Sequence, residues 1–101
     1  EIDTGISGRM ATVVAQKMAK IARERQVICV SHLPQIAAMA DDNFLIEKSV
    51  DDKGSKTELK KLDARLKSEE VARLTGGDAT QTALAHAGEL IAQCDDFKKN
   101  L

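Results

Sequence analysis

One short stretch, residues 27–35, limits what this sequence can fold into. It begins with four apolar residues, VICV, three of them β-branched, and continues with Ser31, His32 and, after a leucine, Pro34. An apolar run without polar alternation is typical of a strand covered on both faces, as in parallel sheets. Pro34 suits the first position of a helix, where its missing N–H is not needed. The stretch therefore predicts a buried strand over 27–31 that ends at His32, followed by a short helix.

His32 is a candidate functional residue because of this position. Ligands of open α/β sheets bind just beyond the carboxyl ends of the strands. A histidine at the end of a strand can also be purely structural, held by hydrogen bonds. Position alone leaves both interpretations open.

Length and composition exclude several classes of protein. The 101 residues suffice for one domain, and 43% hydrophobic with 31% charged residues is typical of a globular chain. A net charge of −1 and only two aromatic residues, Phe44 and Phe97, argue against a main nucleic-acid surface. Cys29 and Cys94 lack metal or disulfide spacing, which favours reduced thiols in a cytosolic protein. No apolar run reaches membrane-spanning length.

The first half of the chain predicts a helix on either side of the strand. Apolar residues at helical spacing indicate an amphipathic helix over 9–25 and predict its core face; they are Met10, Val13, Val14, Met18, Ile21 and Ala22. We expect this helix to lead into the strand by a right-handed parallel crossover. The helix after Pro34 should end near Ala40.

The second half predicts a hairpin and two further helices. Partial alternation over 44–50 and 56–62 around a polar turn indicates a β-hairpin. Ser68 is expected to cap a helix that ends at Gly76-Gly77, and Asp78 to cap a final helix with a tail that frays from Asp95. The apolar stripe of the final helix is Ala83, Leu84, Ala87, Leu90, Ile91 and Cys94, with His86 at the surface. Lys60, Lys61, Arg65 and Lys67 are expected to form a solvated face.

The first eight residues, EIDTGISG, form a second motif. They combine two acids, two hydroxyls and two glycines, and glycine allows a backbone to approach a ligand closely. The same residues would also serve as a plain turn into a helix, with Ser7 as its N-cap.

EIDTGISG and VICVSHLPQIAAMAD, at this separation, resemble the carboxyl-terminal end of the RecN family of bacterial DNA repair proteins. That family belongs to the SMC-like branch of ABC-type ATPases. The resemblance runs from Glu1 to about Ala92. It implies an α/β fold, with the whole chain, residues 1–101, as part of a P-loop ATPase head: a parallel strand with crossover helices, a β-hairpin and C-terminal helices.

The resemblance also implies roles for individual residues. Glu1 matches the acid that closes the Walker B motif and polarises the attacking water, and His32 matches the switch histidine that contacts the γ-phosphate. Ser31 and Gln35 neighbour this histidine. The D-loop, which meets the partner head across the nucleotide, is matched by Asp3, Thr4, Gly5, Ser7 and Gly8.

The family's Walker A loop, signature motif, Walker B strand and coiled coil are missing from this sequence. We therefore expect a fragment that hydrolyses no ATP alone and holds no cofactor or metal, with ATP and Mg²⁺ bound by the full-length protein. The implied partners are the rest of the same head, a second head in a homodimer, and DNA, but no membrane. The resemblance implies that the protein is located in the bacterial cytoplasm and associates with the nucleoid.

Two other functions compete with this one. The triplet Asp3-Thr4-Gly5 also occurs in aspartic proteases, but that chemistry needs two such carboxylates in an all-β fold, whereas this pattern predicts mostly helix. The chain could also be a non-enzymatic interaction or dimerisation module, in which His32 and the acidic loop only cap helices.

Overall fold

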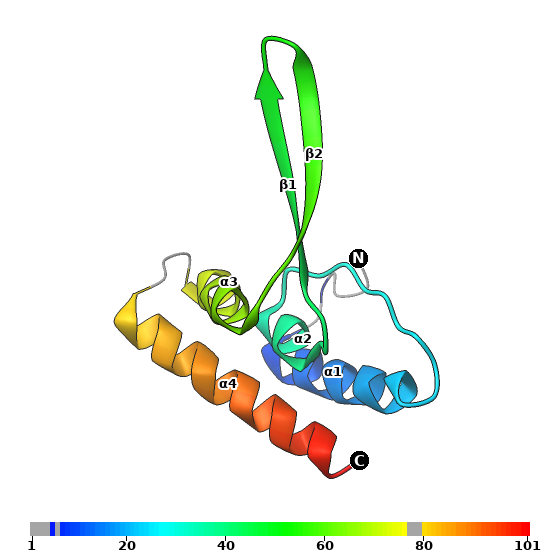
Figure 1. Cartoon of the computed structure of the whole chain (residues 1–101). Coiled ribbons are helices and arrows are strands. Elements are labelled where there is room, and N and C mark those ends of the chain that lie inside the picture. The colour runs from blue at the N-terminus through cyan, green and yellow to red at the C-terminus, as the bar shows by residue number, and fades with distance from the viewer. Residues whose placement is uncertain (1–4, 6, 77–79) are drawn as a thin grey trace.

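The computed structural model describes residue 5, residues 7–76 and residues 80–101. Its regular elements are helices that form one body and a two-stranded sheet that projects from it (Figure 1). In chain order they are α1 (Gly8–Ala22), α2 (Pro34–Met39), β1 (Phe44–Asp51), β2 (Gly54–Lys61), α3 (Ala64–Gly76) and α4 (Gln81–Lys99). The described part of the chain is thus mainly helical, which is the opposite of the all-β fold that the protease hypothesis needs.

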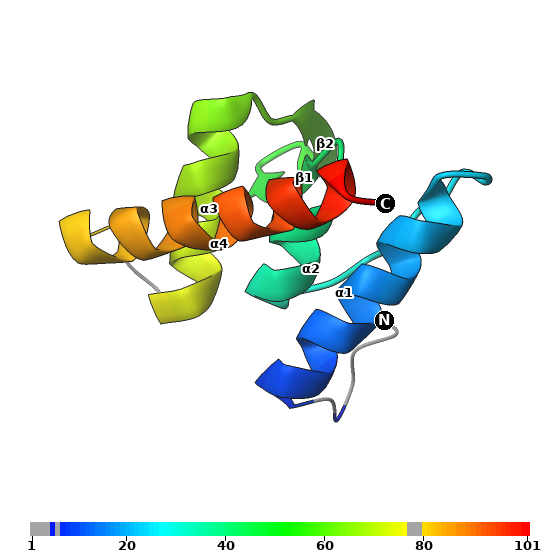
Figure 2. The ribbon, with the colours of Figure 1, turned by 90° about the horizontal axis from the view of Figure 1, so that it is seen from below.

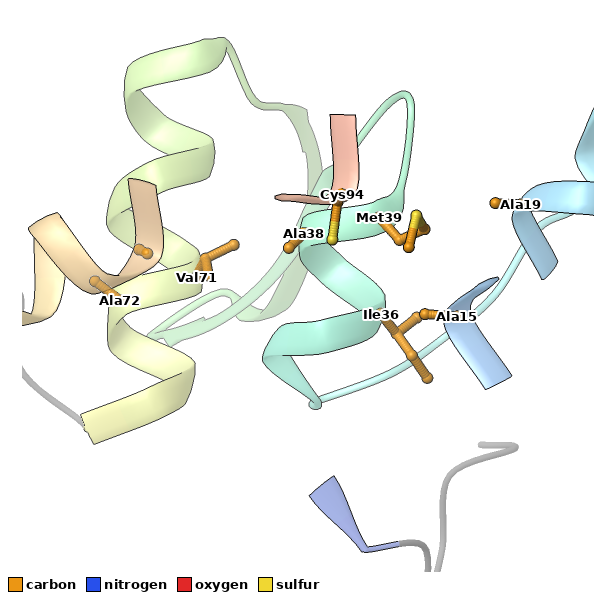
Figure 3. Packing of buried hydrophobic residues seen from close by; sticks show 9 residues of the cluster. Ala15, Ala19, Ile36, Ala38, Met39, Val71, Ala72 and Cys94 are labelled. Atoms are coloured by element: carbon orange, nitrogen blue, oxygen red, sulfur yellow. The ribbon is translucent and has the colours of Figure 1, made fainter. Parts of the chain in front are cut away.

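Helix α2 lies at the centre of the helical body. It contacts α1 on one side and α3 and α4 on the other, as the view from below shows (Figure 2). Figure 3 shows Ile36 and Met39 of α2 beside Ala15 and Ala19 of α1. The buried cluster is small and consists of Ala15, Ala19, Ile36, Ala38, Met39, Val71, Ala72, Ala87 and Cys94. Because alanine dominates it, the helices pack closely but bury little apolar volume.

Helix α1 begins as the sequence predicts but buries a different face. Ser7 is its N-cap, and the Ser7 Oγ accepts a hydrogen bond from the Met10 N–H at 3.3 Å. The helix ends at Ala22, earlier than expected. Its buried residues are Ala11, Ala15 and Ala19.

The predicted core stripe of α1 is therefore wrong in part. Met10 is 51% exposed and Ile21 is 52% exposed, and Val13 is exposed as well, whereas Val14 packs against the core cluster. The small side chains of α1 face α2, where close approach of two helix axes favours alanine. Met10, Val13 and Ile21 lie outside the buried core cluster of the described residues.

The predicted buried strand over 27–31 is not formed. These residues are irregular, and Ile28 is 85% exposed and Val30 61% exposed. A strand exists only through hydrogen bonds to a neighbouring strand, and β1 and β2 pair with each other. The parallel sheet and its crossover are accordingly absent from the described residues, and this part of the predicted fold is corrected.

The β-hairpin is confirmed. Its strands pair antiparallel from Phe44 opposite Lys61 to Asp51 opposite Gly54. The Asp51 Oδ1 accepts a hydrogen bond from the Lys53 N–H at 2.8 Å in the turn, and Gly54 has a φ of +118°, which favours glycine. The hairpin projects from the helical body, so both of its faces are largely exposed (Figure 1).

The prediction that Ser68 caps this helix is wrong, because α3 already begins at Ala64. The Asp63 Oδ1 accepts a hydrogen bond from the Leu66 N–H at 2.8 Å and so acts as the N-cap. The Ser68 Oγ instead donates to the Ala64 carbonyl oxygen within the helix. The end of α3 at Gly76 agrees with the prediction.

Helix α4 is longer than predicted. Thr80 is its N-cap, with the Thr80 Oγ1 accepting from the Ala83 N–H at 3.1 Å, while the predicted cap Asp78 lies outside the described residues. The helix continues to Lys99, so the tail from Asp95 does not fray. Lys98 holds it by an ion pair with Asp41 at 3.0 Å, and Phe97 packs against the core.

The cap assignment of α3 gives a first prediction. Asp63→Ala should lower the free energy of unfolding by about 1 kcal/mol, because it removes the oxygen that serves the first turn. The matched control, Ser68→Ala, should change it by less than about 0.5 kcal/mol, since Ser68 does not cap the helix. Urea denaturation of both variants measures this, and the reverse order of effects would contradict the observed start of α3.

The small core gives a second prediction. Val71 is fully buried, so Val71→Ala should lower the free energy of unfolding by about 2 kcal/mol through lost burial and a residual cavity. Val50→Ala at the exposed hairpin is the control and should cost less than about 0.5 kcal/mol. Equal losses in thermal or urea denaturation would show that Val71 is not part of the stabilising core.

Candidate functional site

The turn that carries His32 is built by local hydrogen bonds. The Ser31 Oγ accepts a hydrogen bond from the Leu33 N–H at 3.0 Å, and the Leu33 carbonyl accepts from the Ala37 N–H at 3.1 Å. Leu33 is the N-cap of α2, with extended backbone, and Pro34 follows at the first helical position. The turn therefore presents His32, whose side chain is exposed, just before the start of α2.

The segment before α1 contributes Gly5, Ser7 and Gly8 to the described residues. Gly5 has a φ of +78°, a left-handed conformation that strains residues with a Cβ. Ser7 caps α1 and Gly8 is its first residue. The predicted site residues Glu1, Asp3 and Thr4 lie outside the described residues. The expectation that the Glu1 carboxylate lies close to His32 therefore stays a prediction.

The two motifs meet at Gly8 and Gln35. A Cβ built on Gly8 would lie 3.5 Å from the Gln35 Nε2, so the start of α1 is in contact with the helix that follows the His32 turn. The Gln35 Oε1 is buried and has no hydrogen-bond partner among the residues that the structure describes. Leaving such an acceptor unsatisfied costs about 1–3 kcal/mol. The sequence names Gln35 only as a neighbour of His32, and the contact with Gly8 could not be read from it.

This arrangement places an exposed imidazole just before α2 and a partly buried amide in the first turn of α2. An imidazole N–H can donate to an anion, and an amide can donate and accept. Among the described residues, no group of three or more His, Cys, Asp or Glu side chains could hold a metal ion. No helix in the described ranges is long and apolar enough to span a bilayer.

A second polar cluster was not anticipated from the sequence. A pocket of about 390 Å³ lies where the end of α2, the base of the hairpin, α3 and α4 meet, and Asn43, Lys67, Asp95 and Lys98 are among its lining residues. The Lys67 Nζ donates to the Ala40 carbonyl oxygen at 2.7 Å. Lys67 therefore belongs to this cluster and not to the predicted solvated face. Its members are far apart in the chain, so no spacing pattern reveals them.

The charges in this pocket influence one another. Burial, and then the nearby charge of Lys98, lowers the pKa of Lys67. Burial also disfavours the charged form of the nearby Cys94, and it therefore raises the pKa of the Cys94 thiol. The Lys98 Nζ pairs with Asp41 at 3.0 Å and with Asp95 at 3.7 Å. These contacts tie α4 and α3 to the end of α2, which makes the cluster a structural junction.

Comparison with known proteins finds relatives along almost the whole chain. It is 41% identical over 99 residues to the DNA repair protein RecN of Bacillus subtilis (strain 168), which covers 97% of this chain and 17% of that protein. It is 42% identical over 101 residues to RecN of Halalkalibacterium halodurans, covering 99% and 18%. RecN of Deinococcus radiodurans is 40% identical over 92 residues, covering 91% and 16%.

No family model matches the chain. The relatives nevertheless agree in name, and the first two matches cover 97% and 99% of the chain. The chain spans less than a fifth of the length of these relatives. It is therefore a segment of a protein of the RecN family.

Proposed function

We propose that this chain is the carboxyl-terminal part of an ATP-hydrolysing head in a RecN-like protein that acts in recombinational repair of DNA double-strand breaks. The observation that carries the proposal is the identity of 36–42% to proteins named DNA repair protein RecN, over at least nine-tenths of the chain. The match to RecN of Halalkalibacterium halodurans covers 99% of the chain and so takes in EIDTGISG and VICVSHLPQ, the motifs that resemble the D-loop and switch segments of ABC-type heads. The fragment alone is inactive in this proposal.

The proposed roles follow the chemistry of phosphoryl transfer. Such a reaction needs a positioned water and hydrogen-bond donors aimed at the developing charge. Glu1 polarises the water, and the imidazole of His32 donates to the γ-phosphate. Residues 3–8 meet a second head of a homodimer across the nucleotide. ATP and Mg²⁺ are held mainly by parts of the protein outside this chain, and DNA is bound by the full-length protein in the bacterial cytoplasm.

The exposed apolar side chains support the proposal that this chain is part of a larger head domain. Ile28 and Val30 face solvent in an irregular segment, and Met10, Val13 and Ile21 are exposed on α1. Exposed apolar side chains that form a continuous surface usually belong to an interface. In the proposal, the rest of the same head covers them, and its strands pair with residues 27–30.

A non-enzymatic interaction module is the second candidate function. The hairpin projects from the helical body (Figure 1). One of its faces carries Phe44, Ile46 and Val50, with Leu59 opposite Ile46, and all four are exposed. An exposed hairpin with an apolar face can bind another protein by adding strands or by packing on it. In that case His32 would only precede α2, without a catalytic role.

Substitution of His32 separates the two candidates. In the full-length protein, His32→Ala should lower the kcat for ATP hydrolysis about a hundredfold, the usual cost of removing one donor to a transition-state charge. His86→Ala, an exposed histidine on α4, is the matched control and should leave kcat unchanged. Steady-state phosphate release measures both. Unchanged turnover in His32→Ala would refute the proposed role of His32 and favour the interaction module.

Substitution of Ile28 tests whether the exposed segment is covered in the full-length protein. Ile28→Asp should lower its free energy of unfolding by more than about 2 kcal/mol, because the carboxylate would be buried without a partner. Ala92→Asp, at an exposed position of α4, is the control and should lower it by only about 1 kcal/mol, the cost of placing an aspartate inside a helix. If Ile28→Asp proves as harmless as the control, this segment is free in the full-length protein.

A further inference from the structure

The positive charge of this chain is concentrated on α1 and the turn that follows it. Residues 8–25 contain five basic residues and a single acid, Glu24, although the net charge of the whole chain is −1. All of these charged side chains are exposed. The basic residues are Arg9, Lys17, Lys20, Arg23 and Arg25. The small net charge of the chain therefore conceals one strongly basic element.

The basic residues of other elements lie closer to acids. Lys61 at the end of β2 pairs with Asp42 at 3.4 Å, and Arg65 of α3 pairs with Glu69 at 3.4 Å. The ion pairs that join two described residues all lie within 41–98. Within the part of the chain that the structure describes, acids thus offset the charge of the hairpin and α3, whereas α1 keeps most of its positive charge.

Arg9 and Lys20 form a stripe along an exposed side of α1, which we call the basic stripe. They are eleven residues apart, which is close to three full turns, so they lie on the same side of the helix. The buried residues of α1 are instead Ala11, Ala15 and Ala19. Helix α1 lies at the edge of the helical body, where it packs on α2 (Figure 2). The basic stripe is therefore accessible.

The basic stripe is separate from the exposed apolar side chains of α1. Met10 and Ile21 each follow one residue after Arg9 and Lys20, so they lie about 100° further around the helix. The rest of a head domain can therefore cover Met10 and Ile21 and leave the basic stripe open.

The spacing of the basic stripe favours an extended anion over a small one. At a rise of about 1.5 Å per residue, Arg9 and Lys20 are about 16 Å apart along α1, so a single phosphate group cannot bridge them. Each strand of duplex DNA carries a phosphate about every 3.4 Å along its axis, so about five phosphates span this length. An acidic protein surface would need carboxylates at a matching spacing, whereas a DNA backbone is charged along its whole length.

We propose that the basic stripe binds the phosphate backbone of DNA, an inference that rests on the proposed function. Lys17, one turn before Lys20, adds positive charge beside the stripe. Helix α1 carries no aromatic residue that could stack on a base, so the contact does not depend on the DNA sequence. It supplements a larger DNA surface outside this chain, which agrees with the net charge of −1.

The test uses the full-length protein and a fluorescently labelled DNA duplex of about 30 base pairs. Fluorescence anisotropy gives the association constant between about 50 and 200 mM NaCl, and the slope of its logarithm against the logarithm of salt concentration reports the number of phosphates contacted. The stripe variant combines Arg9→Gln with Lys20→Gln. The matched control combines Arg65→Gln with Lys61→Gln, the same residue types at exposed sites where acids offset them. A charge-keeping variant combines Arg9→Lys with Lys20→Arg.

We expect the stripe variant to make the slope less steep by about 2, since each lost phosphate contact removes about 0.9. Its affinity at about 100 mM salt should fall at least tenfold. Lys20→Gln alone should produce about half of the change in slope. The control and the charge-keeping variant should change the slope by less than about 0.5, and two duplexes of unrelated sequence should bind equally well.

Equal slopes in the stripe variant and the control would overturn the inference and leave the proposed function standing. A lower Tm in the stripe variant than in the control, without a change in slope, would also overturn it, because the stripe would then pair with an acidic surface of the protein itself. The same holds if the charge-keeping variant binds as weakly as the stripe variant. If the unmodified protein binds no duplex, the DNA part of the proposed function fails together with the inference, whereas ATP hydrolysis by that protein tests the rest of the proposed function.

Discussion

The structure depends on a helix that is too short to be stable by itself. Helix α2 has six residues, so nearly all of its backbone groups belong to a helix end and need outside partners. The Leu33 carbonyl accepts from the Ala37 N–H, the Asn43 Nδ2 donates to the Ala37 carbonyl, and the Lys67 Nζ donates to the Ala40 carbonyl. The helix therefore exists because α3 and the hairpin base complete it.

Packing around α2 explains why alanine dominates the core. Three helices contact α2, and Ala15, Ala19, Ala72 and Ala87 are buried on them. Small side chains let the axes of several helices approach one short helix at the same time. The cost is a small apolar volume, since Val71 is the largest side chain that is fully buried. The polar junction of Lys67, Asp41 and Lys98 adds fixed contacts where apolar burial is limited.

The sequence predicted the local elements better than their partners. The helices, the hairpin and the Ser7 cap depend on residues that are close together in the sequence, through their apolar spacing and turn chemistry. The structure confirms these elements. The strand over 27–31 depends on hydrogen bonds to other strands, which the described residues do not supply. The core face of α1 was misassigned because hydrophobicity alone does not tell which of two apolar faces meets the neighbouring helix. Asp63 and Ser68 are both good caps, and only the structure chooses between them.

In the candidate site, too, the local features could be predicted from the sequence and the tertiary contacts could not. The turn around His32 was predictable, because Ser31 and Pro34 build it from residues next to it in the chain. The contact between Gly8 and Gln35 was not, because it depends on how α1 packs on α2. The His32 turn is thus formed without a parallel sheet, and the predicted strand over 27–31 that leads into it is not formed among the described residues. For the proposed role of His32 in ATP hydrolysis, a preformed turn would reduce the ordering needed on binding, and donors that are already in place stabilise a transition state most effectively.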